Sequence, residues 1–406
     1  MHNLTKNNYI WSIILIIILF FVQIFSTIHY PKKYHTMKSL FNSDVLVLFQ
    51  TPSTKFGRDM IVSQKKLIVP VIENKINNYE LEKFYNPKKI RAVVCYIPNK
   101  ERYIIELKGL YQNFEMLNLW EDTDLIIFYP KDFILSEKSK NNMNKMIMIQ
   151  YDDVEEGTEW DGPIAADDCK PLKGSKEALA HPNGGCKGGE ALYGKYAFIN
   201  SFKFFIDSSI KTVLSNYRYI LKTDADVFLT PRFKNTFPEK KVMVGNGGYS
   251  ADIKTQKRLK DVSSKLKYNH FNIFNVGATW YGNSEDIIKL GDLSYNATKY
   301  IYKNEFLHYH PGWAEWYIGV SSMYGSEIAA NHLFGKDKLE KTDLIDNHAS
   351  SSNDISSVLH VHCWPSGDFY SKSAYLEGKY KDKKPNPNST QINEYAFNII
   401  KNSESL

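Results

Sequence analysis

Short apolar runs alternate with amphipathic stretches between residues 90 and 150. The short runs are rich in β-branched and aromatic side chains, which predicts three strands at Ile90–Ile97, Asp124–Tyr129 and Met146–Gln150. Between them lie a stretch with helical character over 102–119 and a polar helix candidate over 136–146. Strands that alternate with helices in this way predict βαβ units. The fold class is therefore α/β, with a mainly parallel sheet that helices cover on both faces.

The segment from Tyr151 to Gly189 interrupts this pattern, because it is rich in Asp, Gly, Pro and Lys. Its pair Asp167-Asp168 and its run Gly184–Gly189 resemble metal and phosphate sites at first sight. The glycines, however, follow no strand and lack the Lys-Ser/Thr that ends a phosphate loop. We interpret the segment as a long surface loop that could share in acceptor binding.

Regular structure resumes after this loop. Residues 193–214 predict a helix whose apolar face packs in the core, formed by Phe198, Phe202, Phe205 and Ile206. A short apolar strand, Tyr219–Leu221, follows directly.

Residues 9–28 carry no charged side chain and match the roughly twenty residues that a helix needs to cross a bilayer. A cleaved signal peptide is the alternative, but its apolar region is normally shorter and a small-residue cleavage site would follow it. We therefore predict one transmembrane helix. The chain then divides into a cytosolic tail (1–8), a signal anchor (9–28), a stem (29–88), a main domain (89–385) and a C-terminal tail (386–406).

The orientation of the anchor rests on conflicting signals. Lysines after the anchor would by themselves keep the main domain in the cytosol. Two possible N-glycosylation sites, at Asn296 and Asn388, and a possible disulfide between Cys169 and Cys186 indicate a lumenal domain instead. We favour a single-pass type II membrane protein of the Golgi or endoplasmic reticulum, with the main domain in the lumen.

Charge adds little to this picture. The chain has 51 Lys and Arg against 45 Asp and Glu, a formal charge of +6, and much of the excess lies near its ends. No basic stripe is interleaved with aromatic residues as in nucleic-acid binders, so we expect no nucleic-acid partner.

Asp224 and Asp226 are the strongest candidates for chemistry. They follow the apolar strand Tyr219–Leu221, and ligands of α/β sheets bind beyond the carboxyl ends of strands. Side chains two positions apart on an extended segment point the same way, so both carboxylates can reach one divalent cation. Such a cation could neutralise a sugar nucleotide's diphosphate. A structural turn is the alternative, since Asp-x-Asp is common.

Five sequence blocks carry a family resemblance. They are LKTDADVFLTPRF from Leu221, VGNGGYS from Val244, FNVGATWYG from Phe274, GWAEWYIGVS from Gly312 and LHVHCW from Leu359. Together they resemble the nucleotide-diphospho-sugar transferases of the GT-A superfamily, and most closely a eukaryotic domain of unknown function grouped with them. The resemblance covers most of residues 89–380. It implies a GT-A, Rossmann-like fold and a glycosyltransferase activity that uses Mn²⁺ or Mg²⁺.

The resemblance also suggests roles for the FNVGATWYG and GWAEWYIGVS blocks. Asn275 and Gly277 would lie beneath the donor sugar and the acceptor, where a glycine lets backbone approach a ligand; a structural bend is the alternative. Trp313 and Trp316 would offer aromatic faces to a sugar. Glu315, between these rings, would be the general base of an inverting reaction. A helix-start carboxylate is the alternative for Glu315, and in a retaining reaction it would only position substrate.

His360 and His362 lie two positions apart in a predicted strand, Val358–Cys363, and so on one face. In many GT-A enzymes a histidine near this point completes the metal site, and we choose His362 as the ligand. His360 is the second choice as metal ligand, and we expect it to bind the nucleotide or the acceptor. A purely structural histidine pair is the alternative. Lys222 could contact phosphate, or simply end its strand.

We therefore predict transfer of a sugar from a nucleotide diphosphate to a hydroxyl of a glycan, protein or lipid, with a UDP-sugar as the expected donor. Two other classes stay open. A catalytically inactive, membrane-tethered carbohydrate-binding protein would keep the fold without needing metal. A metal-dependent phosphodiesterase would need more His and Asp ligands than these motifs supply.

Overall fold

The computed structural model describes residues 89–151, 197–238, 241–306, 314–364 and 370–406. These residues all belong to the second of two compact units, which spans Glu73–Leu406. Within the described ranges, no helix is both long and apolar enough to span a membrane. The predicted anchor at 9–28 and the predicted stem at 29–88 lie outside the described residues.

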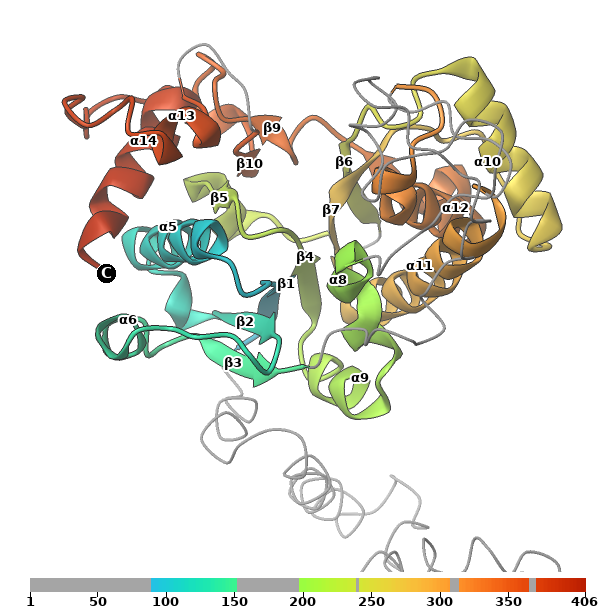
Figure 1. Ribbon diagram of the computed structural model, residues 1–406, viewed down its shortest axis with the longest axis horizontal. Coiled ribbons are helices and arrows are strands. Elements are labelled where there is room, and N and C mark those ends of the chain that lie inside the picture. The colour runs from blue at the N-terminus through green and yellow to red at the C-terminus, as the bar shows by residue number, and fades with distance from the viewer. Residues whose placement is uncertain (1–88, 152–196, 239–240, 307–313, 365–369) are drawn as a thin grey trace, which may run out of the picture. The chain divides into compact units, whose positions relative to one another are not determined.

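A seven-stranded sheet forms the centre of the domain (Figure 1). Its strands, in spatial order, are β3 (Ile147–Gln150), β2 (Thr123–Tyr129), β1 (Arg91–Tyr96), β4 (Tyr219–Lys222), β7 (Val276–Asn283), β6 (Val242–Asn246) and β8 (Leu339–Lys341). Every strand runs in one direction except β7, which is antiparallel to both of its neighbours. The predicted α/β class with a mainly parallel sheet is therefore confirmed.

Strand β1 shows why this sheet is buried on both faces. Val93 and Cys95 pack in a core cluster with Leu107 and Leu110 of helix α5 (Glu101–Leu117), which crosses one face. Alternate residues of a strand point to the opposite face. There Phe128 of β2 stacks on Phe204, with ring centroids 4.0 Å apart.

The described residues contain further helices besides α5. The α-helices are α6 (Glu137–Asn142), α8 (Asn200–Lys203), α9 (Ser208–Leu214), α10 (Ile253–Lys265), α11 (Ser284–Asn304), α12 (Ser321–Lys338), α13 (Lys372–Leu376) and α14 (Ile392–Asn402). Short 3₁₀ helices are η3 (Leu119–Glu121), η4 (Ala197–Ile199), η5 (Phe204–Ile206), η6 (Pro231–Asn235), η7 (Ile318–Val320), η8 (Ile355–Ser357) and η9 (Ser403–Ser405). Helices α11 and α12 pack against each other and against β7, while α8 contacts β1.

A second, three-stranded sheet matters most for the site. Its order is β5 (Val227–Leu229), β10 (His360–His362) and β9 (Asn347–His348). Strand β10 runs antiparallel to β5, with His362 opposite Val227, and the Cys363 amide donates to the Asp226 carbonyl at 2.8 Å. This register fixes His362 beside the residues that follow β4.

The structure corrects the predicted helix at 193–214. Within its described part the chain forms η4, α8 and η5, and then α9, which Asp207 caps by accepting from the Ser209 amide at 2.8 Å. Because these turns do not keep one 3.6-residue period, the expected apolar face is split. Phe202 and Phe205 are buried, whereas Phe198 is 59% exposed and Ile206 is 38% exposed.

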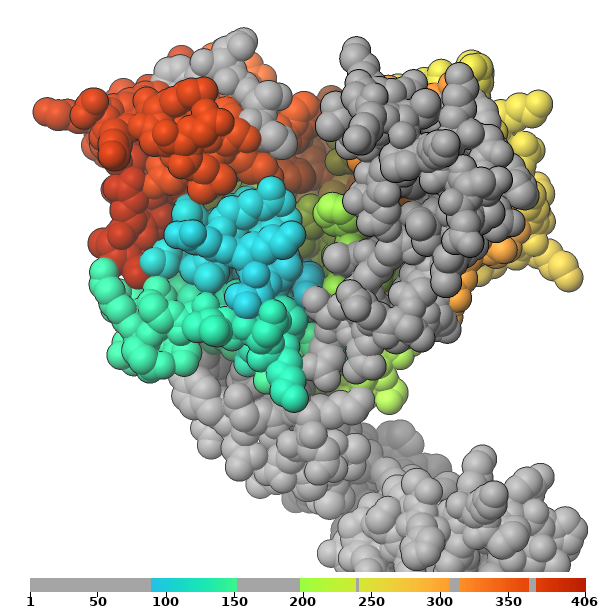
Figure 2. Space-filling model, viewed as in Figure 1, coloured from blue at the N-terminus to red at the C-terminus, as the bar shows by residue number. Residues whose placement is uncertain are grey.

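The segment 386–406 is not a tail. Helix α14 buries Ile392, Phe397 and Ile399 completely and packs against α5. Figure 2 shows the C-terminal residues in red directly against the cyan residues of α5. The packed domain therefore continues to the end of the chain, and the short C-terminal helix carries core residues that its polar surroundings in the sequence concealed.

Candidate metal centre

The candidate centre lies where the order of the sheet reverses. The chain adds β2 and β3 on one side of β1 and then returns to place β4 on the other side. In open α/β sheets, ligands bind outside the carboxyl ends of the strands at such a switch point. The link Thr223–Asp226 leaves β4 at this edge, and the first turn of α5 follows β1 there.

Three side chains converge at this edge. Asp224, Asp226 and His362 each offer one ligand atom, and these atoms all lie within 4.8 Å of one another. Asp224 is 45% exposed in its side chain, while Asp226 and His362 are 9% and 14% exposed. The expectation that both carboxylates and His362 point to one place agrees with this geometry. Metal binding itself stays a prediction.

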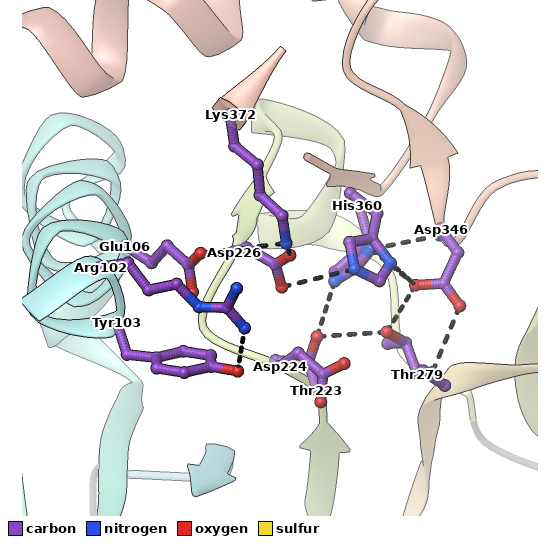
Figure 3. Close-up of polar contacts among 12 residues, drawn as sticks. Arg102, Tyr103, Glu106, Thr223, Asp224, Asp226, Thr279, Asp346, His360 and Lys372 are labelled. Carbon is purple, nitrogen blue, oxygen red and sulfur yellow. Dashed lines mark hydrogen bonds and ion pairs between the residues drawn. The ribbon is translucent and has the colours of Figure 1, made fainter. Parts of the chain in front are cut away.

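The buried part of the cluster continues as a row of alternating charges. Lys372, the first residue of α13, donates to Asp226 Oδ2 (Figure 3). His362 lies with Nε2 3.4 Å from Asp226 Oδ1 and Nδ1 3.4 Å from Asp346 Oδ1. Each carboxylate therefore faces at least one cationic group, which is the condition for tolerating charge in a buried site.

This arrangement shifts the pKa values of its members. Burial opposes a charged imidazole, but the charge of Asp226, with hydrogen bonds to Asp226 and Asp346, raises the pKa of His362 well above its usual value. Burial also opposes ionisation of Asp226, yet His362 and then Lys372 hold the pKa of that carboxyl well below its usual range. His362 must lose its proton at Nε2 before this nitrogen can coordinate a metal.

Asp346 holds the far nitrogen of His362, and the sequence analysis missed it. A Cβ atom at Gly245 would lie 2.1 Å from Asp346 Oδ2, and one at Gly277 would lie 2.5 Å from the same oxygen. Hydrogen bonding from His362 outweighs burial and lowers the pKa of Asp346 to about 2. The predicted role of Gly277, close approach of a ligand to backbone, is thus filled in this structure by the protein's own carboxylate.

His360 is buried and its ring nitrogens are both engaged by protein, which argues against the predicted nucleotide or acceptor binding. Its Nδ1 accepts the Asp346 amide at 3.2 Å and its Nε2 lies 2.9 Å from Thr223 Oγ1 (Figure 3). Thr223 and Thr279 join hydroxyls at 3.1 Å, and Thr279 donates to Asp346. Burial lowers the pKa of His360 to about 4, so the ring is neutral and structural.

Lys222 is also enclosed by protein. Its ammonium donates to the Ala278 carbonyl at 3.1 Å and lies over the rings of Phe202 and Trp280. It is 3.7 Å from Asp224 Oδ1, and its side chain is only 3% exposed. The contacts of this ammonium are therefore all with protein groups, and phosphate contact stays a prediction.

Glu106 is a second residue that the sequence analysis missed. It lies on α5 beside Lys372, whose Nζ is 3.9 Å from Glu106 Oε1 (Figure 3). The residue is only 7% exposed, yet neither of its carboxylate oxygens has a hydrogen-bond partner. Burial and then the charge of Asp226 raise the pKa of Glu106 to about 8. An acidic residue among the apolar positions of this helix was a readable signal in the sequence.

Asn275 stabilises a loop next to β7. It has a left-handed backbone, with φ of 59°, and its side-chain oxygen accepts the Ser250 amide at 3.0 Å. Ser250 donates in turn to Glu327 Oε2 at 2.7 Å, and Val276 donates to the same oxygen at 3.1 Å. Burial raises the pKa of Glu327 to about 7. The contacts of Asn275 are therefore those of the structural bend that was its alternative interpretation.

The predictions for the aromatic block, GWAEWYIGVS, have a different outcome from those for Asp224 and Asp226. Trp313 lies outside the described residues. Trp316 is fully buried, stacks on Tyr324 with centroids 4.4 Å apart, and donates Nε1–H to the Glu305 carbonyl at 3.2 Å. A direct sugar contact by Trp316 is therefore wrong, because its ring belongs to the core. Glu315 lies against α10, with Oε2 3.3 Å from Lys254 Nζ, and is not part of the Asp224–Asp226–His362 cluster.

The lumenal markers are only partly described. Cys169 and Cys186 lie outside the described residues. Asn296 is exposed on α11, whereas Thr298 of the same sequon is buried. Asn388 is exposed in the turn before α14. These positions do not test glycosylation, which stays a prediction at both sites.

Comparison with known families identifies a family whose description names no function. Residues 86–406 match the family model described as "Domain of unknown function (DUF7164)". No curated protein matches the chain. The match includes the segment 386–406, in agreement with the packing of α14.

Several solved structures share a partial likeness with the chain. One is the galactosyltransferase LgtC in complex with donor and acceptor sugar analogs, with 10% identity, 72% of this chain and 94% of that chain covered, and a TM-score of 0.35. Another is a glycosyltransferase involved in the glycosylation of the major capsid of PBCV-1, with 10% identity, 71% and 98% covered, and a TM-score of 0.31. A third is Core-mannan synthase A from Aspergillus fumigatus in its Mn/GDP form, with 12% identity, 62% and 72% covered, and a TM-score of 0.31. At these scores the likeness carries no assignment of fold or function.

Proposed function

We propose that this chain, which belongs to the DUF7164 family, is a metal-dependent glycosyltransferase. In this proposal it moves a sugar from a nucleotide diphosphate to a hydroxyl of a glycan, protein or lipid. The observation that carries the proposal is the convergence of Asp224, Asp226 and His362 at the switch point of an α/β sheet. The blocks around these residues resemble those of GT-A transferases, which supports the same reading.

The donor set fits Mn²⁺ or Mg²⁺. Carboxylate oxygens suit hard divalent ions, and an imidazole nitrogen favours Mn²⁺ over Mg²⁺. Asp346 faces Nδ1 of His362 from the other side, which is the arrangement by which proteins orient a histidine ligand. Gly245 and Gly277 leave room for that carboxylate where any side chain would collide with it. A cation held here would neutralise negative charge on the leaving nucleoside diphosphate.

The remaining roles would belong to side chains of the protein. Asp224 and Asp226 hold the cation, Lys222 balances Asp224, and Asp346 orients His362 so that Nε2 faces Asp226. In an inverting reaction we propose Glu315 as the base that accepts the proton of the acceptor hydroxyl. Its support is that α10, on which it packs, follows the carboxyl end of β6 and so starts at the same edge of the sheet.

The cellular setting is also part of the proposal. We place the chain in the Golgi or endoplasmic reticulum membrane, with residues 9–28 as anchor and the domain in the lumen. The uncharged segment and the exposed sequon asparagines support this setting. Protease protection of microsomes that carry the full chain tests it. A domain digested without detergent would contradict it.

The activity is tested with the full-length protein in detergent. A panel of UDP- and GDP-sugars is incubated with and without Mn²⁺, and release of nucleoside diphosphate is measured. The proposal predicts turnover with at least one donor, lost both without the metal and in Asp226→Asn. Donor binding without turnover, equal in wild type and Asp226→Asn, would instead identify an inactive carbohydrate-binding protein. No binding and no turnover with any donor would overturn the proposal.

A further inference from the structure

Lys372 is within ion-pair distance of two carboxylates, but it donates a hydrogen bond to only one of them, Asp226. Its ammonium contacts Asp226 Oδ2 and lies 3.9 Å from Glu106 Oε1 (Figure 3). Its side chain is 20% exposed, so the ammonium is partly withdrawn from water. A lysine has a flexible four-carbon stem, and a small rotation would bring the charge from one carboxylate to the other.

Glu106 is the less satisfied of the two partners. Both of its oxygens are buried without a hydrogen-bond donor. The nearby Arg102, one helical turn earlier on α5, donates to the hydroxyl of Tyr103 instead. A buried carboxyl without donors is destabilising, so a simple packing role does not explain why it is there. The residue has the properties of a partner that is used in another state of the site.

A divalent cation would create that state. It would share Asp226 with the Lys372 ammonium, and two positive charges around one carboxylate repel each other strongly in a buried site. The same cation would offset the negative charge of Asp226, which after burial is the largest cause that raises the pKa of Glu106. Both changes move the ammonium in one direction, away from Asp226 and toward Glu106.

We propose that Glu106 is a positioning residue for the metal centre, which takes over the Lys372 ammonium when a divalent cation binds Asp226. In the empty site Lys372 neutralises Asp226 and holds its side chain in place. In the loaded site Glu106 provides the alternative partner, so that the cation does not have to compete with the lysine. This inference rests on the metal site of the proposed function.

The test is a titration of full-length protein with Mn²⁺ and no nucleotide, in which electron paramagnetic resonance measures free Mn²⁺. Glu106→Gln should bind Mn²⁺ about tenfold more weakly, because the lysine then has nowhere else to go. Lys372→Met should bind more tightly than wild type, because the competitor is gone. In the double variant, Glu106→Gln should have no further effect, so its affinity should equal that of Lys372→Met.

Two outcomes would overturn the inference. Glu106 could act only as a negative charge near the cation, and Glu106→Gln would then weaken Mn²⁺ binding equally with and without Lys372. Alternatively, Glu106→Gln could bind as wild type does. Glu101→Gln is the matched control, since it removes an exposed charge from the first turn of the same helix and should leave the affinity unchanged.

Failure of the inference differs from failure of the proposed function. If wild type binds neither Mn²⁺ nor Mg²⁺, the metal site is wrong and both proposals fall. If wild type binds Mn²⁺ and the cycle shows no coupling between Glu106 and Lys372, only the inference falls. Melting curves of the metal-free variants establish that each one is folded.

Discussion

The acidic link after β4 and the aromatic block around Trp316 look equally functional in the sequence, but they fold into different kinds of region. Asp224, Asp226 and His362 meet at the edge of the sheet, and charged groups surround them on several sides. Trp316 is instead fully buried between Phe306 and Tyr324. Aromatic residues near a carboxylate therefore do not by themselves indicate a sugar site. The position of a residue relative to the strand ends is more informative.

The largest effect is expected from a substitution in the aromatic block, and it is an effect on stability. Trp316→Ala removes a buried ring and its hydrogen bond to Glu305, which should lower the free energy of unfolding by about 3–5 kcal/mol. Urea denaturation measures this, and titration under native conditions should give an unchanged Mn²⁺ affinity. A folded variant with normal stability but impaired sugar binding would show that the aromatic block is a ligand site after all.

Glu327 allows a second test, in which stability is measured as a function of pH. Its folded pKa of about 7 lies above the ordinary value of 4.5, so the folded state keeps a proton that the unfolded state releases. The resulting stability is fully present below pH 4.5 and is lost as pH rises through 7. Glu327→Gln does not titrate, so its stability relative to wild type should rise by about 3 kcal/mol over this window. A difference that is constant across denaturation curves from pH 4.5 to 8 would contradict the prediction.

Asp226→Asn breaks the acidic region at its centre. It should weaken Mn²⁺ binding about 100-fold, which corresponds to about 2.7 kcal/mol, because it removes a charged ligand and leaves the metal near Lys372. Calorimetric titration gives the affinity. Glu315→Gln is the comparison from the aromatic block, and its Mn²⁺ affinity should equal that of wild type. Equal losses in the two variants would mean that Glu315 belongs to the metal site.

Asp346→Asn should have the smallest effect of the four. Asparagine adopts the left-handed conformation readily, so the φ of 59° at this position is tolerated. The variant loses the negative charge that faces His362 Nδ1, and Mn²⁺ affinity should fall about tenfold, or about 1.4 kcal/mol. Measured with the same calorimeter, an affinity unchanged from wild type would remove Asp346 from the support of His362.

Much of the fold could be predicted from local patterns. Strands β1 to β4 and helix α5 have strong periodicity, and each lies close to its predicted range. The prediction of a single helix at 193–214 was wrong, because short 3₁₀ turns and the cap at Asp207 interrupt the helical period. Helix α14 was missed because its packing against α5 depends on contacts with residues almost 300 positions earlier in the chain, which no local pattern contains.

The site divides in the same way. Asp224 and Asp226 could be found because their strand precedes them directly, and His362 because it ends a short strand. His360 was misassigned, since the choice between two histidines on one face depends on Thr223 and Asp346, which come from other elements. Asp346 and Lys372 were missed for this reason too. Their roles consist of contacts with His362 and Asp226, which lie on other elements.

The most direct test of the central claim is a crystal structure of the domain soaked with Mn²⁺, with an anomalous difference map calculated at a wavelength where manganese scatters strongly. The account predicts one strong peak within coordinating distance of Asp224, Asp226 and Nε2 of His362. A fully soaked crystal with no peak among these three side chains, or with its strongest peak at another group of residues, would contradict it.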